Sequence, residues 1–178
     1  MTRLTNHSNI RIALFAIFAT LVGPSTQAQA QDVFVSLELP ARPAAAVEME
    51  QQADDLLVAG RGWERAAGLY RRAAELRGSD DVKSADNLRM AGYLQFYRGR
   101  PKAAVLTLMQ AGEAFLALGD VERAAEAFID GAWVATRADM PVEARDLRER
   151  GRLLTRSPLL QVEDRTALVR RLGETAGQ

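Results

Sequence analysis

Apolar and polar positions alternate along most of the chain with the period of an α-helix. In the segment "WERAAGLYRRAAEL" the charged residues, among them Arg65, Arg71 and Glu75, lie mostly on one side of a helical projection. The apolar positions are spaced by three and four residues and form one stripe: Trp63, Ala66, Ala67, Tyr70, Ala73 and Ala74. This pattern predicts an amphipathic helix that buries one face.

The same pattern continues from Val47 almost to the C-terminal end and is interrupted by short turn signals. Gly78, Gly99 and Gly119 stand where helices are expected to stop, as is usual for glycine. The segments expected to be helical are 47–59, 63–77, 82–98, 101–118, 120–137, 141–155 and 158–172. The sequence therefore predicts an all-α protein of about seven helices.

Related phrases begin at Trp63, Pro101, Val121 and Pro141, with spacings of 38, 20 and 20 residues. A helix-plus-turn module of this length pairs into antiparallel hairpins, which is typical of an α-solenoid. Glycine inside a helix costs about 1 kcal/mol relative to alanine. Four glycines recur inside the expected helices at nearly the same spacing: Gly92, Gly112, Gly131 and Gly151. We therefore expect neighbouring helices to approach closely at these positions.

Small and large apolar residues recur in a fixed order within the modules: Ala66/Tyr70/Ala73, Ala104/Leu108/Ala111 and Ala124/Phe128/Gly131. This order resembles the tetratricopeptide repeat (TPR) family over residues 47–156. The units are longer than the roughly 34 residues usual in that family, and the proline that ends such units is missing. The resemblance implies a stack of hairpins that binds other proteins. Residues 157–178 lie outside the motif and are expected to form a capping helix and tail.

The N-terminal residues 1–30 have the layout of a secretory signal peptide. Arg3 and Arg11 flank a polar start, an apolar run covers residues 12–22, and the sequence around Ala30 fits a cleavage site. The apolar run is shorter than the roughly 20 residues that span a bilayer. We therefore expect the protein to be exported, to the periplasm or beyond, without stable membrane insertion after cleavage.

Residues 31–46 differ from the rest of the chain. Val33, Val35, Leu37 and Leu39 alternate with other residues, which is the period of a strand. Prolines follow, and we expect a flexible extended arm that links the leader to the helices. A strand donated to a partner is the alternative.

Composition excludes most catalytic chemistry. The chain has no cysteine, and its single histidine, His7, lies in the expected leader. Cleavage would leave 21 basic and 23 acidic residues, because residues 1–30 hold two arginines and no acid. We therefore expect no enzyme activity, no metal, no cofactor and no binding to nucleic acid.

The candidate partner-binding residues are aromatic rings and arginines that recur between hairpins. Trp133 lies 40 residues after Tyr93, and each is followed four residues later by Tyr97 or Arg137. Aromatic and arginine side chains are enriched at binding hot spots. We predict one recognition surface on the concave side of the solenoid, made of Arg89, Tyr93, Tyr97, Trp133 and Arg137. Core packing of Tyr93 and Trp133 remains the alternative.

A secondary candidate is the arginine stripe of Arg145, Arg148 and Arg152, which could bind carboxylates or phosphates. A solvated face neutralised by Asp146 and Glu149 is the alternative. The expected function is a non-catalytic interaction module, a scaffold or assembly factor of the cell envelope by resemblance. Two other interpretations are a self-associating structural solenoid, which would be a homo-oligomer, and an enzyme.

Overall fold

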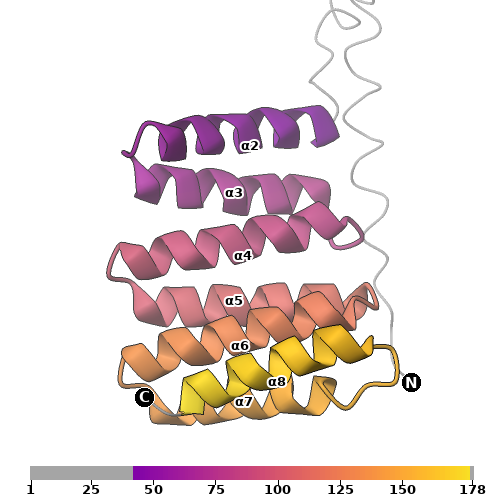
Figure 1. Cartoon of the computed structure of the whole chain (residues 1–178). Helices are drawn as coiled ribbons and strands as arrows, with labels where there is room; N and C mark the ends of the chain where they lie inside the picture. The colour runs from indigo at the N-terminus through magenta and orange to yellow at the C-terminus, as the bar shows by residue number, and fades with distance from the viewer. Residues whose placement is uncertain (1–41, 177–178) are drawn as a thin grey trace, which may run out of the picture. The chain divides into compact units, whose positions relative to one another are not determined.

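The computed structural model describes residues 42–176, which form seven helices and no strand (Figure 1). The predicted all-α class is therefore confirmed. The helices are α2 (Arg42–Val58), α3 (Trp63–Arg77), α4 (Val82–Tyr97), α5 (Pro101–Ala117), α6 (Val121–Arg137), α7 (Pro141–Leu154) and α8 (Val162–Ala176). The predicted signal peptide and most of the predicted arm lie outside the described residues.

Helices α2 to α7 pack in chain order, each against the next (Figure 1). Short turns join them, and Gly99 and Gly119 occupy these turns with φ of 72° and 77°, a left-handed conformation that glycine adopts without strain. Helix α8 departs from this order, because it packs on α6 as well as on α7. The predicted array of helical hairpins is confirmed.

Two helix ends differ from the predicted boundaries. Residues 42–46, expected to be extended, belong to α2. Proline fits the first turn of a helix, and three alanines follow Pro43. The last helix begins at Val162 rather than at residue 158. The backbone N–H of Leu159 donates to the Ser157 hydroxyl at 3.2 Å, so Ser157 starts a turn there instead of a helix.

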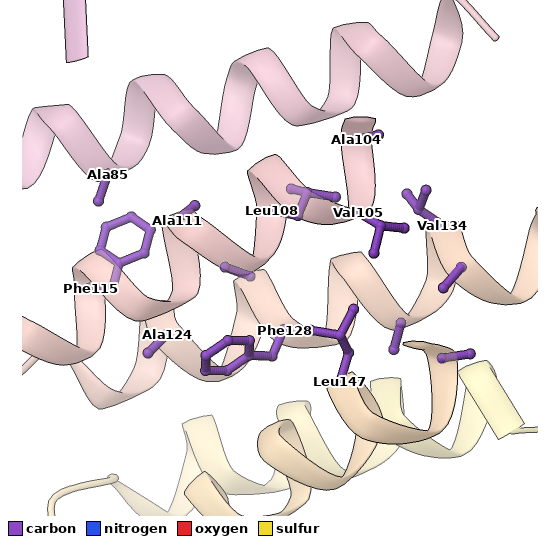
Figure 2. Close-up of a cluster of buried hydrophobic side chains, with 14 residues drawn as sticks. Ala85, Ala104, Val105, Leu108, Ala111, Phe115, Ala124, Phe128, Val134 and Leu147 are labelled. Atoms are coloured by element: carbon purple, nitrogen blue, oxygen red, sulfur yellow. The ribbon is translucent and has the colours of Figure 1, made fainter. Parts of the chain in front are cut away.

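The larger apolar core lies between α4, α5, α6 and α7 (Figure 2). Its largest fully buried side chains are Phe115, Leu108 and Leu147, and Phe128 is almost as buried. Alanines separate these large residues, among them Ala104 and Ala124. A smaller core at the α2–α4 end has fewer large side chains and consists of Ala53, Ala66, Ala67, Tyr70, Ala91 and Leu94.

The four helix-interior glycines lie where a neighbouring helix inserts a large side chain. A β-carbon added to Gly92 would lie 2.7 Å from Leu108 Cγ, and one added to Gly112 would lie 2.7 Å from the Phe128 ring. The corresponding contacts of Gly131 and Gly151 are with Leu147 and Ile129, both at 3.0 Å. The predicted close approach is confirmed at all four positions.

Candidate partner-binding surface

Three of the five predicted site residues line one surface pocket of about 440 Å³: Tyr93, Tyr97 and Trp133. They meet because α4 and α6 occupy equivalent places in successive hairpins, as the 40-residue spacing of Tyr93 and Trp133 predicted. Helix α8 supplies part of the remaining wall, which the sequence did not predict. The other lining residues are Ile129, Asp130, Arg171, Glu174 and Thr175.

Four aromatic rings continue from this pocket across α3, α4 and α6, and we call them the aromatic row: Trp63, Tyr97, Phe96 and Trp133. Trp63 and Tyr97 are 5.9 Å apart between ring centroids, in an edge-to-face geometry. Phe96 lies 5.7 Å from Tyr97 and 5.1 Å from Trp133. Such pairs hold one another in place beyond the effect of burial alone.

The aromatic row is open to solvent along much of its length. Tyr97 is 63% exposed and Trp63 is 37% exposed, whereas Phe96 and Trp133 pack partly against the core. The guanidinium of Arg137 lies 4.5 Å from the Trp133 ring centroid, within the range of a cation–π contact. Exposed rings that are already held in place by their neighbours lose little freedom when a partner covers them.

Trp63 is a site residue that sequence reasoning missed. It shares the apolar stripe of its helix and was assigned to the buried face, but it is the exposed member of that stripe. The other five members are buried. Its position at the first residue of α3, directly after Gly62, sets it apart from the other members of the stripe.

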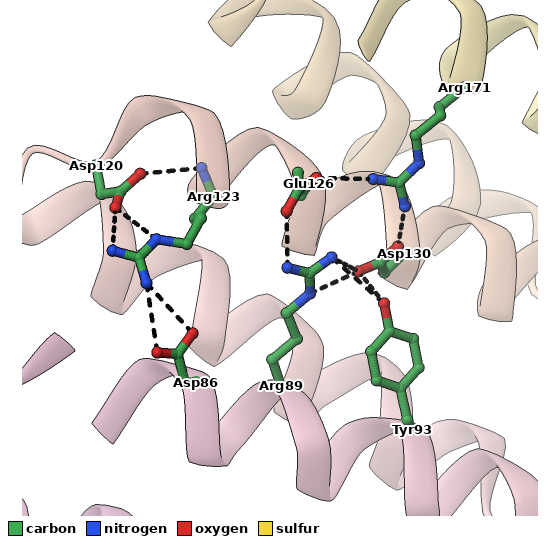
Figure 3. Close-up of polar contacts among 8 residues, drawn as sticks. All are labelled: Asp86, Arg89, Tyr93, Asp120, Arg123, Glu126, Asp130 and Arg171. Carbon is green, nitrogen blue, oxygen red and sulfur yellow. Dashed lines mark hydrogen bonds and ion pairs between the residues drawn. The ribbon is translucent and has the colours of Figure 1, made fainter. Parts of the chain in front are cut away.

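Arg89 and Tyr93 belong to a polar cluster beside the pocket (Figure 3). We call it the Asp130 cluster; its members are Arg89, Tyr93, Glu126, Asp130 and Arg171. Arg89 donates to Asp130 at 2.8 Å and to Glu126 at 2.7 Å. Arg171 of α8 donates to the same two carboxylates at 2.5 and 3.2 Å, and the Tyr93 hydroxyl donates to Asp130.

Burial makes the Asp130 cluster a fixed part of the fold. The Asp130 side chain is only 6% exposed, and a carboxylate at that depth needs close partners. Burial and the adjacent Asp130 charge raise the pKa of Tyr93, so its hydroxyl keeps its proton and remains a donor. The polar groups of Arg89 and Tyr93 are thus engaged within the chain. The groups left to meet a partner are the Tyr93 ring, Tyr97, Trp133 and Arg137.

Several polar contacts join residues that are 37 positions apart in the chain. Asp86 of α4 pairs with Arg123 of α6, as Arg89 does with Glu126 (Figure 3). Glu113 of α5 pairs with Arg150 of α7. These bonds connect α4 to α6 and α5 to α7, in each case the second helix along, and we call them the polar ladder.

The secondary candidate stripe on α7 is largely paired within the chain. Arg152 donates to Glu149 at 2.5 and 2.7 Å. Arg148 donates to the carbonyl oxygen of Thr175 at 2.8 Å and so binds the C-terminal end of α8, where cations are favoured. Arg145, Arg148 and Arg152 line a shallow depression of about 680 Å³ together with three carboxylates, Glu143, Asp146 and Glu149. The mixed charge favours the solvated-face alternative.

No cluster of three or more potential metal ligands occurs between residues 42 and 176. Two pairs of adjacent aspartates, Asp54-Asp55 and Asp80-Asp81, contribute contacts to the fold. Asp81 caps α4, and Asp54 accepts a hydrogen bond from the Tyr70 hydroxyl. Within the same residues, no helix has the length and apolar content needed to cross a membrane.

Comparisons of the chain with models of known protein families, with characterised proteins and with solved structures find no match. The resemblance to the TPR family therefore stays a prediction, which rests on the residue pattern and on the confirmed array of hairpins.

Proposed function

We propose that this protein is a non-catalytic interaction module, similar to TPR proteins, that binds a segment of a partner protein on the aromatic row. The observation that carries the proposal is the exposure of two aromatic rings in contact with each other, Trp63 and Tyr97, beside the pocket that Tyr97 and Trp133 line. Large exposed rings have a cost in water that partner binding removes.

Charge around the aromatic row supports a partner segment with apolar side chains and carboxylates. Arg137 lies at one end of the row against Trp133. At the other end, Arg61 and Arg98 line a pocket of about 380 Å³ beside Trp63 and Tyr97. Glu64 in that pocket pairs with Arg100 at 2.7 Å, so its negative charge is offset.

The predicted signal peptide supports work outside the cytoplasm. We infer export to the periplasm or beyond, with a soluble mature chain that begins near residue 31. The intact mass of the exported protein tests this, and a full-length species retained in the membrane would contradict it.

Tryptophan fluorescence gives a direct test of the aromatic row. The chain has two tryptophans, Trp63 and Trp133, and both lie in the row. Peptides selected from a random display library on the full chain serve as probes. Peptides that bind the row are expected to shift the tryptophan emission on titration, because they exclude water from both rings.

A double variant and a matched control complete the test. Tyr97→Ala with Trp133→Ala is expected to weaken peptide binding about tenfold or more, in line with hot-spot truncations. The control, Leu106→Ala with Leu116→Ala, removes two exposed apolar side chains of α5 and is expected to change affinity less than about twofold. An equal loss of peptide affinity in both double variants, with helicity retained, contradicts the proposal. The stripe of Arg145, Arg148 and Arg152 would then be the better candidate for the binding site.

The self-association alternative receives no support from the first helix of the described array. Most of its exposed residues are polar, among them Glu48, Gln51, Gln52 and Asp55, and two are large and apolar, Val47 and Val58. A mainly polar face does not favour end-to-end stacking. Light scattering decides the question, since a monomer at high concentration removes this alternative.

A further inference from the structure

Helix α8 is held to α6 by two kinds of contact that resemble a peptide bound in a groove. Leu168 and Leu172, four residues apart, pack with Leu160 against an apolar strip of α6 made of Val121, Ala125 and Ile129. Arg171, which lies between the two leucines in sequence, donates to Asp130 and Glu126 at the edge of that strip. An amphipathic helix with anchors spaced by four residues is a recurring mode of recognition.

The face of α6 beneath α8 is preformed without α8. Asp130 keeps two donors from α4, the guanidinium of Arg89 and the hydroxyl of Tyr93. Glu126 likewise keeps its bond from Arg89, and Ile129 is supported from the other side by the close contact with Gly151 of α7. Removal of α8 therefore leaves no isolated buried charge on α6.

Helix α8 is also the most loosely attached helix of the array. It contacts α6 and α7 less extensively than neighbouring helices contact one another, and residues 155–161 give it a longer connection than the other turns have. Val162 and Val169 are 69% and 54% exposed. The Nε of Arg165 is buried without a hydrogen-bond partner among the described residues, which weakens the attachment further.

We propose that this face of α6 is a helix-binding site, that α8 occupies it as an internal ligand, and that a partner's amphipathic helix of the pattern Leu-x-x-Arg-Leu displaces α8. The two leucines of the partner fill the strip of Val121, Ala125 and Ile129, and its arginine takes the two carboxylates. The site differs from the aromatic row, so either proposal can fail alone. The two are adjacent, since Arg171, Glu174 and Thr175 of α8 form one wall of the pocket at Trp133.

The test uses a fluorescent peptide with the sequence of residues 160–176, titrated into the full chain. In the wild-type chain the attached α8 competes at a high effective concentration, so binding is expected to be weak. Arg171→Ala in the chain loosens the attached helix, and the peptide is expected to bind about tenfold more tightly. Arg170→Ala is the matched control, because it removes the neighbouring, exposed arginine and is expected to leave affinity unchanged.

The same two substitutions, made in the peptide, distinguish the role of Arg171 in binding to α6 from its effect on the stability of the chain. On the Arg171→Ala chain, the peptide with Arg170→Ala is expected to bind as the natural peptide does, and the peptide with Arg171→Ala is expected to lose about tenfold or more. Equal affinity of both peptides, or no binding to a chain that keeps its helicity, overturns the proposal.

Hydrogen exchange on the wild-type chain decides the case if the Arg171→Ala chain does not fold. A detachable α8 opens locally, so its amides are expected to exchange at least about tenfold faster than those of α6 and α7. Exchange of α8 at the same rate as α6 shows that α8 detaches only when the array unfolds, and it overturns the proposal.

Discussion

The array contains two buried polar clusters that use the same residue types and differ in their surroundings. The first, which we call the Glu50 cluster, joins α2, α3 and α4. Arg77, with a side chain only 7% exposed, donates to Glu50 at 2.5 and 2.7 Å and to Asp81 at 2.8 Å. Asn87 also donates to Glu50. The Asp130 cluster instead joins α4, α6 and α8 and lies beside the pocket that the exposed Tyr97 and the half-buried Trp133 line.

A buried ion pair alone is therefore no ground for proposing a binding site. In the Glu50 cluster one guanidinium, that of Arg77 in α3, is shared by two carboxylates, Glu50 of α2 and Asp81 at the start of α4. In the Asp130 cluster two guanidinium groups from different helices share two carboxylates. Without α8, Asp130 and Glu126 would still accept hydrogen bonds from Arg89 of α4. The arrangement of donors, rather than the residue types, distinguishes the two.

The largest expected effect comes from removing the central carboxylate of each cluster. Asp130→Ala takes a partner from Arg89, Arg171 and Tyr93 together, and is expected to lower the free energy of unfolding by about 3–5 kcal/mol. Glu50→Ala takes a partner from only two groups, Arg77 and Asn87, and Arg77 keeps its bond to Asp81, so we expect a smaller loss of about 1–3 kcal/mol. Urea denaturation followed by circular dichroism measures both. A larger loss of unfolding free energy for Glu50→Ala than for Asp130→Ala would contradict this prediction.

Glycine-to-alanine substitutions in α5 and in α3 give a second contrast, because they are expected to change the stability of the fold in opposite directions. Gly112→Ala, in α5, would place a methyl group against the Phe128 ring, and overpacking of this kind is expected to cost about 1–3 kcal/mol. Gly68→Ala, in α3, meets no atom within 4 Å and is expected to stabilise the chain by about 0.5–1 kcal/mol. Thermal melts of the two variants should move in opposite directions. Shifts of the same sign would contradict the close packing of α5 on α6.

The smallest expected effect is a pH dependence specific to the Glu50 cluster. Hydrogen bonds from Arg77 lower the pKa of Glu50 below its ordinary value of 4.5. A carboxylate whose pKa is lower in the folded chain stabilises the fold above that ordinary value and loses the effect as the pH falls through the lowered pKa. Glu50→Gln is therefore expected to be about 1 kcal/mol less stable than the wild type at neutral pH.

Urea denaturation at a series of pH values measures this difference between Glu50→Gln and the wild type. The gap is expected to close below pH 4.5, as Glu50 of the wild type takes up its proton. A gap that stays constant down to pH 3 would show that Glu50 acts through shape rather than charge.

Much of the fold follows from local pattern, and the structure confirms it at particular residues. The stripe from Ala66 to Ala74 is buried, and the glycines from Gly92 to Gly151 meet large side chains of neighbouring helices. Spacing also brought Tyr93 and Trp133 to one pocket. These features depend on periods within a helix or on the length of one hairpin, which a single sequence contains.

The remaining features depend on contacts between distant residues. Arg89 contacts Glu126 and Asp130. Arg171 contacts Asp130 from 41 positions away and Glu126 from 45 positions away. A sequence with many arginines and acids allows many such pairings, and the 37-residue spacing of Arg89 and Glu126 is one of many spacings that it offers. The packing of α8 on α6 was not predictable either. The turn at Ser157 and Pro158 places the first residue of α8 at Val162, several residues after the predicted start.

The polar ladder also makes the layers of the array non-interchangeable. Helices α4 and α6 begin at Val82 and Val121, 39 residues apart, so Arg123, Glu126 and Asp130 correspond to Ser84, Asn87 and Ala91. A second copy of α4 in the place of α6 would face Asp86, Arg89 and Tyr93 with those three residues and would supply none of the charges they now meet. Many solenoids lengthen by repeating one unit, since each unit needs only a similar neighbour. In this chain, the charges of α6 match those of α4 and a second copy of α4 would not, so repetition of that unit would lengthen the array without these contacts.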